Sequence, residues 1–354
     1  MVYNYITENI HYSYVPFRQS ALIPQKARDV LVSHIGDCKD MSTLCIAILN
    51  ELDINAYHVL VNTKDEGRNL NTLPCIAFNH CIVATETEDG LIYLDPTAYN
   101  YPMGSLPPGN VGAFSLLIKP GVKEPEYIPA AKLIANNIFR QTIVNMNEDN
   151  SILIQEQSTK MGMAGVSMRY LYRDKSQQEK EKKLAEIINK DMANAKLIKL
   201  EIENLDNIVP RVQYYYEYKV SNYVTEVNQF KFLKIPWTDA LDSNPALSHD
   251  NRKYPYCYWV STDTLVEDIE IHLPDQYQPV DLIKEVKLSS SIADYSLSLT
   301  FSEGSLKGKR ELNYKKEVIS PDEYLDFKKF YNNAIKADNR QILLQKKEVE
   351  VVTK

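Results

Sequence analysis

The chain has 354 residues, of which 44% are hydrophobic and 25% are charged. This length predicts two or three domains, and the composition excludes a disordered chain or a membrane-embedded one. The 40 basic and 47 acidic residues give a net charge of −7, which disfavours nucleic acid as a partner because an acidic chain repels a phosphate backbone.

Several other classes are disfavoured by missing sequence signals. The sequence contains no run of about 18 apolar residues, so no membrane span is predicted. The chain as written carries no export leader; a periplasmic or secreted location is expected if the N-terminus was trimmed, and a cytoplasmic one otherwise. The five cysteines form no CxxC pair, which argues against a zinc ribbon or a disulfide framework. Nucleotide-binding glycine motifs are also missing.

The first 125 residues combine helix and strand signals. Apolar residues recur at spacings of three and four over 38–52, which predicts an amphipathic helix. Three runs rich in strand-forming residues follow, and they predict adjacent antiparallel strands. These runs span 56–62, 75–85 and 91–95. The proline- and glycine-rich stretch 97–110 predicts a long irregular loop.

Beyond residue 125 the pattern becomes one of alternating strands. Strands are predicted over 151–157, 212–220, 227–235 and 295–301. Two helices are predicted in this part, one after a capping box formed by Ser176 and Glu179, the other after Ser320 and Pro321. The sequence therefore predicts a β-rich, sandwich-like domain with one or two helices.

Three residues in the first part form a candidate catalytic set. Cys38 follows Gly36 and Asp37 at the predicted start of a helix, where the helix dipole and free backbone N–H groups favour thiolate over thiol. His80 lies in a predicted strand, and Asp95 ends the next one. Neighbouring strands can place the two side by side, with the imidazole towards Cys38 and the carboxylate fixing its tautomer.

These motifs resemble a known family. The sequences GDCKD at 36–40, VLVNT at 59–63, FNHCIV at 78–83 and YLDPTA at 93–98 are similar to those of the transglutaminase-like superfamily, in its bacterial GDCKD-type branch. The resemblance covers about residues 1–125. It implies that Cys38 is the nucleophile, His80 the general base and acid, and Asp95 the residue that orients the histidine.

The resemblance also implies the architecture. We expect an α+β protein with a papain-like, transglutaminase-like catalytic domain over 1–125 and a β-rich C-terminal domain over 126–354, similar in pattern to the C-terminal domains of this branch. One motif departs from the family. Where members often carry glutamine before proline, this chain has Ile23-Pro24. Gln19 and Gln25 are candidate substitutes, and only the backbone N–H of Cys38 is predicted to hold an oxyanion.

The remaining cysteines, histidines and tyrosines have simpler interpretations. Cys45 is expected to pack in the core, and Cys75, Cys81 and Cys257 are interpreted as structural. His34 is expected to be a solvated loop residue, although it lies near enough to modulate Cys38. The other histidines have no metal-ligand spacing. The tyrosine cluster at 214–218 could stack on sugars or bases, but tyrosine is also an ordinary strand residue.

The leading functional hypothesis is a cysteine hydrolase, a protease or amidase that cleaves peptide or carboxamide bonds through a thioester of Cys38. Its partner would be a protein or peptide substrate, with a glycan or cell-envelope ligand as a candidate for the C-terminal domain. Neither a metal nor an organic cofactor is expected. Two alternatives stay open: a catalytically silent scaffold, and a protein-glutamine transamidase. Hydrolysis is favoured over transamidation because 97–110 offers small residues and no tryptophan precedes Trp237 to wall an amine tunnel.

Overall fold

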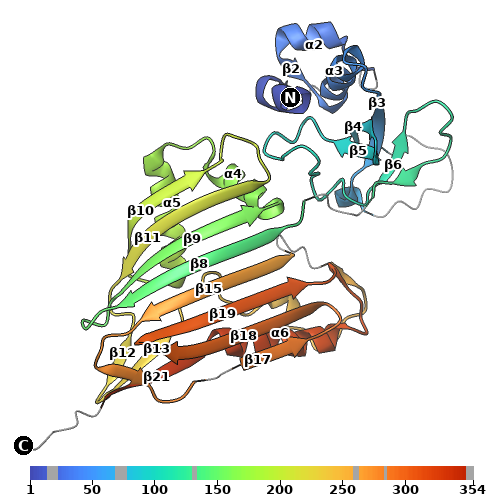
Figure 1. The fold of residues 1–354 in the computed structure, drawn as a ribbon. Coiled ribbons are helices and arrows are strands. Elements are labelled where there is room, and N and C mark those ends of the chain that lie inside the picture. The colour runs from blue at the N-terminus through green and yellow to red at the C-terminus, as the bar shows by residue number, and fades with distance from the viewer. Residues whose placement is uncertain (14–22, 68–77, 130–133, 258–262, 283–284, 348–354) are drawn as a thin grey trace, which may run out of the picture. The chain divides into compact units, whose positions relative to one another are not determined.

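The computed structural model describes residues 1–13, 23–67, 78–129, 134–257, 263–282 and 285–347 (Figure 1). The chain divides into two compact units. Unit 1 comprises Met1–Ala135 with Ile208–Pro210, and unit 2 comprises Asn136–Asn207 with Arg211–Lys354. The boundary between the units follows residue 135, whereas the sequence pattern changes near residue 125. Both units mix helix and sheet, so the α+β class is confirmed.

Unit 1 places three helices beside a small antiparallel sheet. The helices are α1 (Val2–Asn9), α2 (Ala27–Ser33) and α3 (Cys38–Glu51), with a 3-10 turn, η1, at Lys64–Glu66. Strands β1 (His11–Tyr12) and β2 (Ile35–Gly36) form a short parallel pair. The main sheet has the order β5-β4-β3-β6-β7. Its strands are β3 (Ala56–Asn62), β4 (His80–Thr87), β5 (Gly90–Leu94), β6 (Phe114–Leu117) and β7 (Glu126–Tyr127).

The sequence predictions for unit 1 agree with these elements. The helix predicted over 38–52 is α3, and the strands predicted over 56–62 and 91–95 are β3 and β5. The strand predicted over 75–85 is found from residue 80 onward as β4, while residues 75–77 lie outside the described part of the chain. Helix α3 buries Met41, Leu44 and Cys45 against the sheet, which fixes the orientation of its first turn.

Unit 2 is built on one large sheet of eight strands in the order β10-β11-β9-β8-β15-β19-β18-β17. Neighbours are antiparallel except for β8 and β15. The strands are β8 (Asn137–Met146), β9 (Ile152–Met161), β10 (Ala195–Glu203), β11 (Arg211–Val220), β15 (Thr264–His272), β17 (Glu285–Ser289), β18 (Ala293–Ser302) and β19 (Ser305–Tyr314).

Smaller elements complete unit 2. A four-stranded sheet has the order β12-β13-β21-β16, and β14 pairs with β20. These strands are β12 (Thr225–Val227), β13 (Phe230–Lys234), β14 (Tyr256–Cys257), β16 (Tyr277–Pro279), β20 (Val318–Ile319) and β21 (Gln341–Lys346). The helices are α4 (Met163–Tyr172), α5 (Gln177–Asp191) and α6 (Tyr324–Asp338), with a 3-10 turn, η2, at Pro245–Leu247.

Two sequence predictions for unit 2 were wrong in part. The described residues of unit 2 contain three helices rather than one or two, because α4, between β9 and α5, was not expected. The single strand predicted over 227–235 covers the last residue of β12 and all of β13. Asn228 adopts a left-handed φ of 56°, a conformation that asparagine tolerates at a tight hairpin turn. The chain therefore reverses there.

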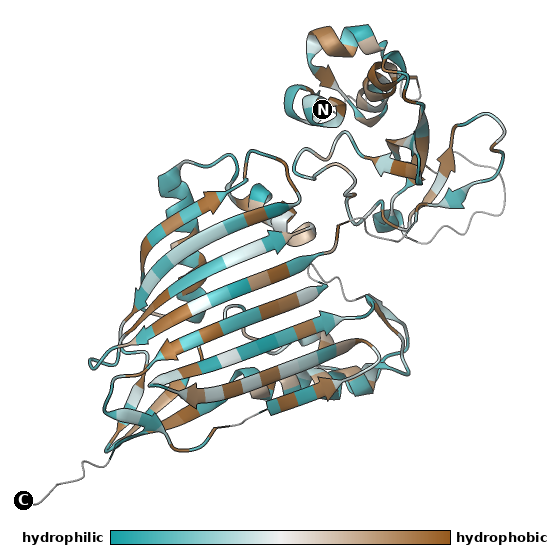
Figure 2. Cartoon of the chain, viewed as in Figure 1, coloured by the Kyte–Doolittle hydropathy of each residue, from teal (hydrophilic) through white to brown (hydrophobic). Residues whose placement is uncertain are grey.

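One face of the large sheet is the core of unit 2. Along each strand, buried and solvent-facing residues alternate, and Figure 2 shows the matching alternation of hydrophobic and hydrophilic residues. The buried face, called the inner face below, packs with α4, α5 and α6 into one apolar cluster. Trp237 fits over Gly308 on this face, because a Cβ there would lie 3.1 Å from the indole and 2.9 Å from Ile269.

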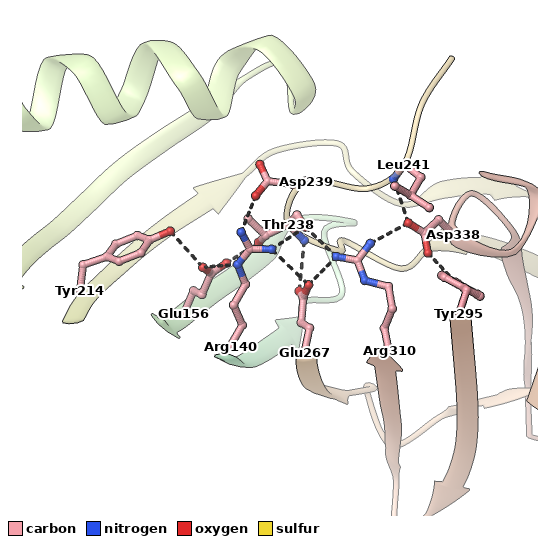
Figure 3. Close-up of polar contacts among 10 residues, drawn as sticks. All are labelled: Arg140, Glu156, Tyr214, Thr238, Asp239, Leu241, Glu267, Tyr295, Arg310 and Asp338. Atoms are coloured by element: carbon pink, nitrogen blue, oxygen red, sulfur yellow. Dashed lines mark hydrogen bonds and ion pairs between the residues drawn. The ribbon is translucent and has the colours of Figure 1, made fainter. Parts of the chain in front are cut away.

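A row of charged side chains interrupts the inner face. Arg140, Glu267 and Arg310 are direct cross-strand neighbours on β8, β15 and β19 and are at most 2% exposed. Arg310 Nη2 lies 2.7 Å from Glu267 Oε2, and Arg310 Nη1 lies 2.6 Å from Asp338 Oδ2 of α6 (Figure 3). Arg140 donates to the Thr238 carbonyl at 2.9 Å and pairs with Asp239. The row therefore anchors residues 238–241 and α6 to the sheet.

Candidate functional site

Cys38 occupies the first position of α3, as the sequence predicts. The Asp37 side chain caps the helix by accepting hydrogen bonds from the backbone N–H groups of Lys39 and Asp40, at 3.1 and 3.2 Å. Gly36 is needed for the close approach of the preceding strand, since a Cβ at this position would lie 2.8 Å from Asp40 Cβ. The GDC sequence thus sets the thiol at a capped helix start, where it is half-buried.

His80 begins β4, directly after Asn79, whose side chain forms two hydrogen bonds with Thr63. The Asn79 side chain accepts a hydrogen bond from Thr63 N at 2.9 Å and donates to Thr63 Oγ1 at 2.7 Å. Because Thr63 directly follows β3, this contact ties the start of β4 to the end of its neighbour. The imidazole that follows is 17% exposed, so it reaches towards the open side of the site.

The structure brings Cys38, His80 and Asp95 together. His80 Nε2 lies 2.9 Å from Asp95 Oδ2, and the Cys38 side chain lies near enough to the imidazole to raise the pKa of His80. Since Nε2 faces the carboxylate, Nδ1 is the ring nitrogen left for the sulfur. The three side chains therefore lie in sequence, from a half-buried thiol through the imidazole to a carboxylate that is 2% exposed.

Asp95 accepts hydrogen bonds from other groups besides His80. Its Oδ1 accepts hydrogen bonds from the backbone N–H and the hydroxyl of Thr97, at 3.0 and 2.7 Å. Its Oδ2 accepts one from Asn110 Nδ2 at 2.8 Å. Sequence reasoning missed Asn110, because an asparagine within Pro-Pro-Gly-Asn carries only a turn signal. These donors leave the carboxylate one orientation, with Oδ2 towards His80.

The groups around His80 favour its protonated form, the imidazolium. Burial alone would lower the pKa of His80, but the hydrogen bonds and negative charges of Asp95 and Cys38 outweigh it and raise the pKa to about 10. Burial would raise the pKa of Asp95, but the hydrogen bonds from His80 and Thr97 hold it below its usual range. At neutral pH the site therefore holds a cationic ring between two acceptors.

The other predicted residues lie away from this chemistry. Cys45 and Cys81 are buried, and burial raises the pKa of each thiol to about 12. Cys75 lies outside the described residues. His58 Nε2 is 2.9 Å from the Thr43 hydroxyl, between β3 and α3. His34 contacts the Asn9 carbonyl through Nδ1 at 2.9 Å.

Gln25 is hydrogen-bonded to the first turn of α3. Its backbone N–H and its side-chain amide each donate to the Asp40 carboxylate at 2.7 Å. Burial would raise the pKa of Asp40, but these hydrogen bonds hold it below its usual range. Gln19, the other candidate for an oxyanion donor, lies outside the described residues. Gln25 thus connects the segment before α2 to the turn that carries Cys38.

The segment 97–110 is an irregular loop, as the sequence predicts, and hydrogen bonds from α1 hold it in place. The Tyr3 hydroxyl of α1 contacts the carbonyls of Ala98 and Tyr101 at 3.3 and 3.2 Å. Tyr101 and Asn110 are 5% and 2% exposed. The loop therefore serves as a support for Asp95.

The described part of the chain contains neither a metal-binding cluster nor a membrane-spanning helix. In the ranges given above, no group of three or more histidine, cysteine or acidic side chains could hold a metal ion. None of the described helices has the length and apolar character needed to cross a membrane.

Comparison with known proteins gives limited matches. The family model for a domain of unknown function with solved structure, DUF3858, matches residues 228–344 in unit 2. No curated protein matches the chain. Among solved structures, a Parabacteroides distasonis protein described as "a putative protease" matches with a TM-score of 0.54 and 11% identity, over 97% of this chain and 50% of that one. This chain thus spans about half of that protein's length, and it shares a mixed α+β fold with it.

Proposed function

We propose that this protein is a transglutaminase-like cysteine hydrolase that cleaves peptide or carboxamide bonds through Cys38, His80 and Asp95. The observation that carries the proposal is the His80 ring, which is hydrogen-bonded to the buried Asp95 carboxylate and has its pKa raised by both Asp95 and the neighbouring Cys38. In this proposal unit 1 contains the papain-like catalytic domain, and the β-rich unit 2 supports recognition or stability.

In the first step the Cys38 thiolate attacks the carbonyl carbon, a C–S bond forms, and the carbonyl π electrons move to oxygen. The backbone N–H of Cys38 at the helix start is the donor that we assign to this oxyanion. The oxyanion then collapses, the C–N bond breaks, and the His80 imidazolium gives its proton to the leaving amine. A thioester on Cys38 and a neutral His80 remain.

In the second step the neutral His80 accepts a proton from water as the water oxygen attacks the thioester carbon. The C–S bond breaks and the acid product leaves. The thiolate and the imidazolium are restored. Asp95 stays ionised throughout, and its role is to keep Nε2 protonated and the ring turned towards the sulfur.

The reactivity of the thiol gives the first test. Iodoacetamide is applied to the native full chain, and each cysteine is followed by peptide mass spectrometry. We expect Cys38 to be alkylated before the buried Cys45 and Cys81, and we expect His80→Ala to slow that reaction by about tenfold. Alkylation of Cys38 no faster than that of glutathione, together with no turnover, would favour the silent scaffold.

Turnover is then measured with fluorescently labelled casein and with a peptide carboxamide. Cys38→Ser is the matched control, because it keeps the size and a hydrogen-bonding group at the helix start. Turnover that persists in Cys38→Ser would refute the proposal. A labelled primary amine present in the same reaction separates the outcomes: release of free acid supports hydrolysis, whereas faster amine incorporation identifies a transamidase.

A further inference from the structure

Unit 2 contains a cavity of about 420 Å³ on the inner face of its large sheet. Strands β9 and β11 form its floor, helices α4 and α5 one wall, and residues 234–242 the other. Met168, Leu184 and Ile188 make the helical wall apolar. This volume lies within the range of about 300–1,000 Å³ that is typical of small-molecule sites.

Lys160 is the unusual group in this cavity. It lies on the inner face of β9, between Ile138 and Val212 of the neighbouring strands, and its ammonium lies 5.1 Å from the centre of the Tyr214 ring. Burial, and then the charge of Arg140, lower the pKa of Lys160. Within the described ranges, the ammonium has no carboxylate within salt-bridge distance and no hydrogen-bond acceptor.

The nearby carboxylates are already used by other groups. Glu156 Oε1 lies 3.5 Å from Arg140 Nε, and its Oε2 accepts a hydrogen bond from the Thr238 hydroxyl. Asp239 pairs with Arg140 (Figure 3). Because both acids pair with Arg140, Lys160 has no anionic partner among the described residues.

Tyrosine hydroxyls add hydrogen-bond donors to the same cavity. Tyr214, Tyr216 and Tyr218 line it, and their rings stack in a row with centres 5.2 and 5.8 Å apart. The Tyr218 hydroxyl contacts only a weak acceptor, Met192 Sδ, at 3.4 Å. The Tyr216 hydroxyl has no hydrogen-bond partner among the residues that the structure describes.

We propose that this cavity binds a small organic carboxylate with an apolar body. The carboxylate would pair with the Lys160 ammonium and accept a hydrogen bond from the Tyr216 hydroxyl, and the apolar body would lie along Leu184 and Ile188 of α5. A cationic ligand fits less well because the acids that act on Lys160, Glu156 and Asp239, already pair with Arg140, and the other two acids that line the cavity, Asp191 and Asp242, are exposed to solvent. This binding site is independent of the Cys38 chemistry.

The test uses octanoate as the probe, with the full chain in a calorimeter at neutral pH. We expect one octanoate to bind with a Kd of about 1 mM or tighter, and 1-octanol and octylammonium to bind at least about tenfold more weakly. Equal binding of octanoate and 1-octanol would refute the role of the charge. Stronger binding of octylammonium would show that the acids determine the site, and no binding of any probe would also overturn the proposal.

Two lysines at the same cavity give a matched pair of variants. Lys160→Met should weaken octanoate binding by about tenfold or more, whereas Lys190→Met, at the exposed end of α5, should change it by less than about twofold. Equal effects of the two variants would contradict the assignment. If Lys160→Met fails to fold, acylation of the wild-type chain by acetic anhydride decides the matter: octanoate should protect Lys160 and leave Lys190 unprotected, and unchanged labelling of Lys160 would overturn the proposal.

Discussion

Each unit contains a series of buried polar contacts, and the two series end on different kinds of group. In unit 1 the contacts run from the buried Asp95 through His80 to Cys38, a thiol that is half-buried. In unit 2 the row from Arg140 through Glu267 and Arg310 ends on other protein groups.

Under the function that we propose, this difference separates a catalytic site from a structural one. A buried ion pair contributes little net stability once the loss of hydration is counted, so a row closed at both ends acts mainly by fixing which segments meet. A chain that ends on a half-buried nucleophile can instead pass a proton to a bound molecule. The chemistry of the terminal group, a thiol in unit 1 and a carboxylate paired with Arg140 in unit 2, therefore distinguishes the two sets of contacts.

The largest effect is expected at the reactive end. Cys38→Ala should reduce turnover by at least about a thousandfold with little change in stability, because the thiol is only half-buried. Rates are measured with the casein and carboxamide substrates. The control is Cys45→Ala, which should keep its activity and lose about 1 kcal/mol of stability. If the two phenotypes were exchanged, the nucleophile would be misassigned.

Breaking the closed row should act on stability alone. Glu267→Gln leaves Arg310 and Arg140 with one fewer buried anion, and we expect a loss of about 3 kcal/mol. Both tryptophans, Trp237 and Trp259, belong to unit 2, so tryptophan fluorescence in urea follows its unfolding.

The control for that prediction is an exposed pair on the same sheet. Lys309 Nζ lies 2.6 Å from Glu311 Oε1, with side chains 51% and 34% exposed. Glu311→Gln should therefore cost less than about 0.5 kcal/mol. Alkylation of Cys38 should be unchanged in both variants, and slower alkylation in Glu267→Gln would mean that the row also serves the reactive site.

The donors around Asp95 should give graded losses of turnover. Asp95→Asn removes the anion that orients His80 and should lower kcat by about a hundredfold or more. Asn110→Ala removes one donor to Asp95 Oδ2 and should lower kcat by about tenfold, with KM unchanged, because Asn110 positions the carboxylate and does not touch substrate. A change confined to KM would place Asn110 in substrate binding instead.

The smallest effect is a pH dependence of stability in unit 1. The pKa of His80 is raised from 6.5 to about 10 in the folded chain, so its stabilising contribution is fully present below pH 6.5 and is lost as the pH rises towards 10. Urea unfolding, followed by exposure of the buried Cys45, should show this loss in the wild type and not in His80→Gln. An NMR titration that places His80 near 6.5 would contradict the prediction.

Local signals in the sequence were enough for the elements that carry the candidate site. The apolar spacing over 38–52 predicts α3, and in the structure the capping box of Asp37 and Asp40 satisfies its first backbone N–H groups. The capping box at Ser176 and Glu179 likewise predicts the start of α5. Runs of strand-forming residues predict β3 and β5 to within one residue. The juxtaposition of His80 and Asp95 follows from the hairpin of β4 and β5.

Only the tertiary structure decided which polar residues are buried together. Arg140, Glu267 and Arg310 lie on strands far apart in the sequence, and each alone looks like an outward-facing charge within an alternating strand. Strand register places them side by side, and no local pattern encodes a register between distant strands. For the same reason Asn110 meets Asp95 only when a loop folds back on β5. Secondary structure is determined by neighbours along the chain, whereas these contacts depend on long-range packing.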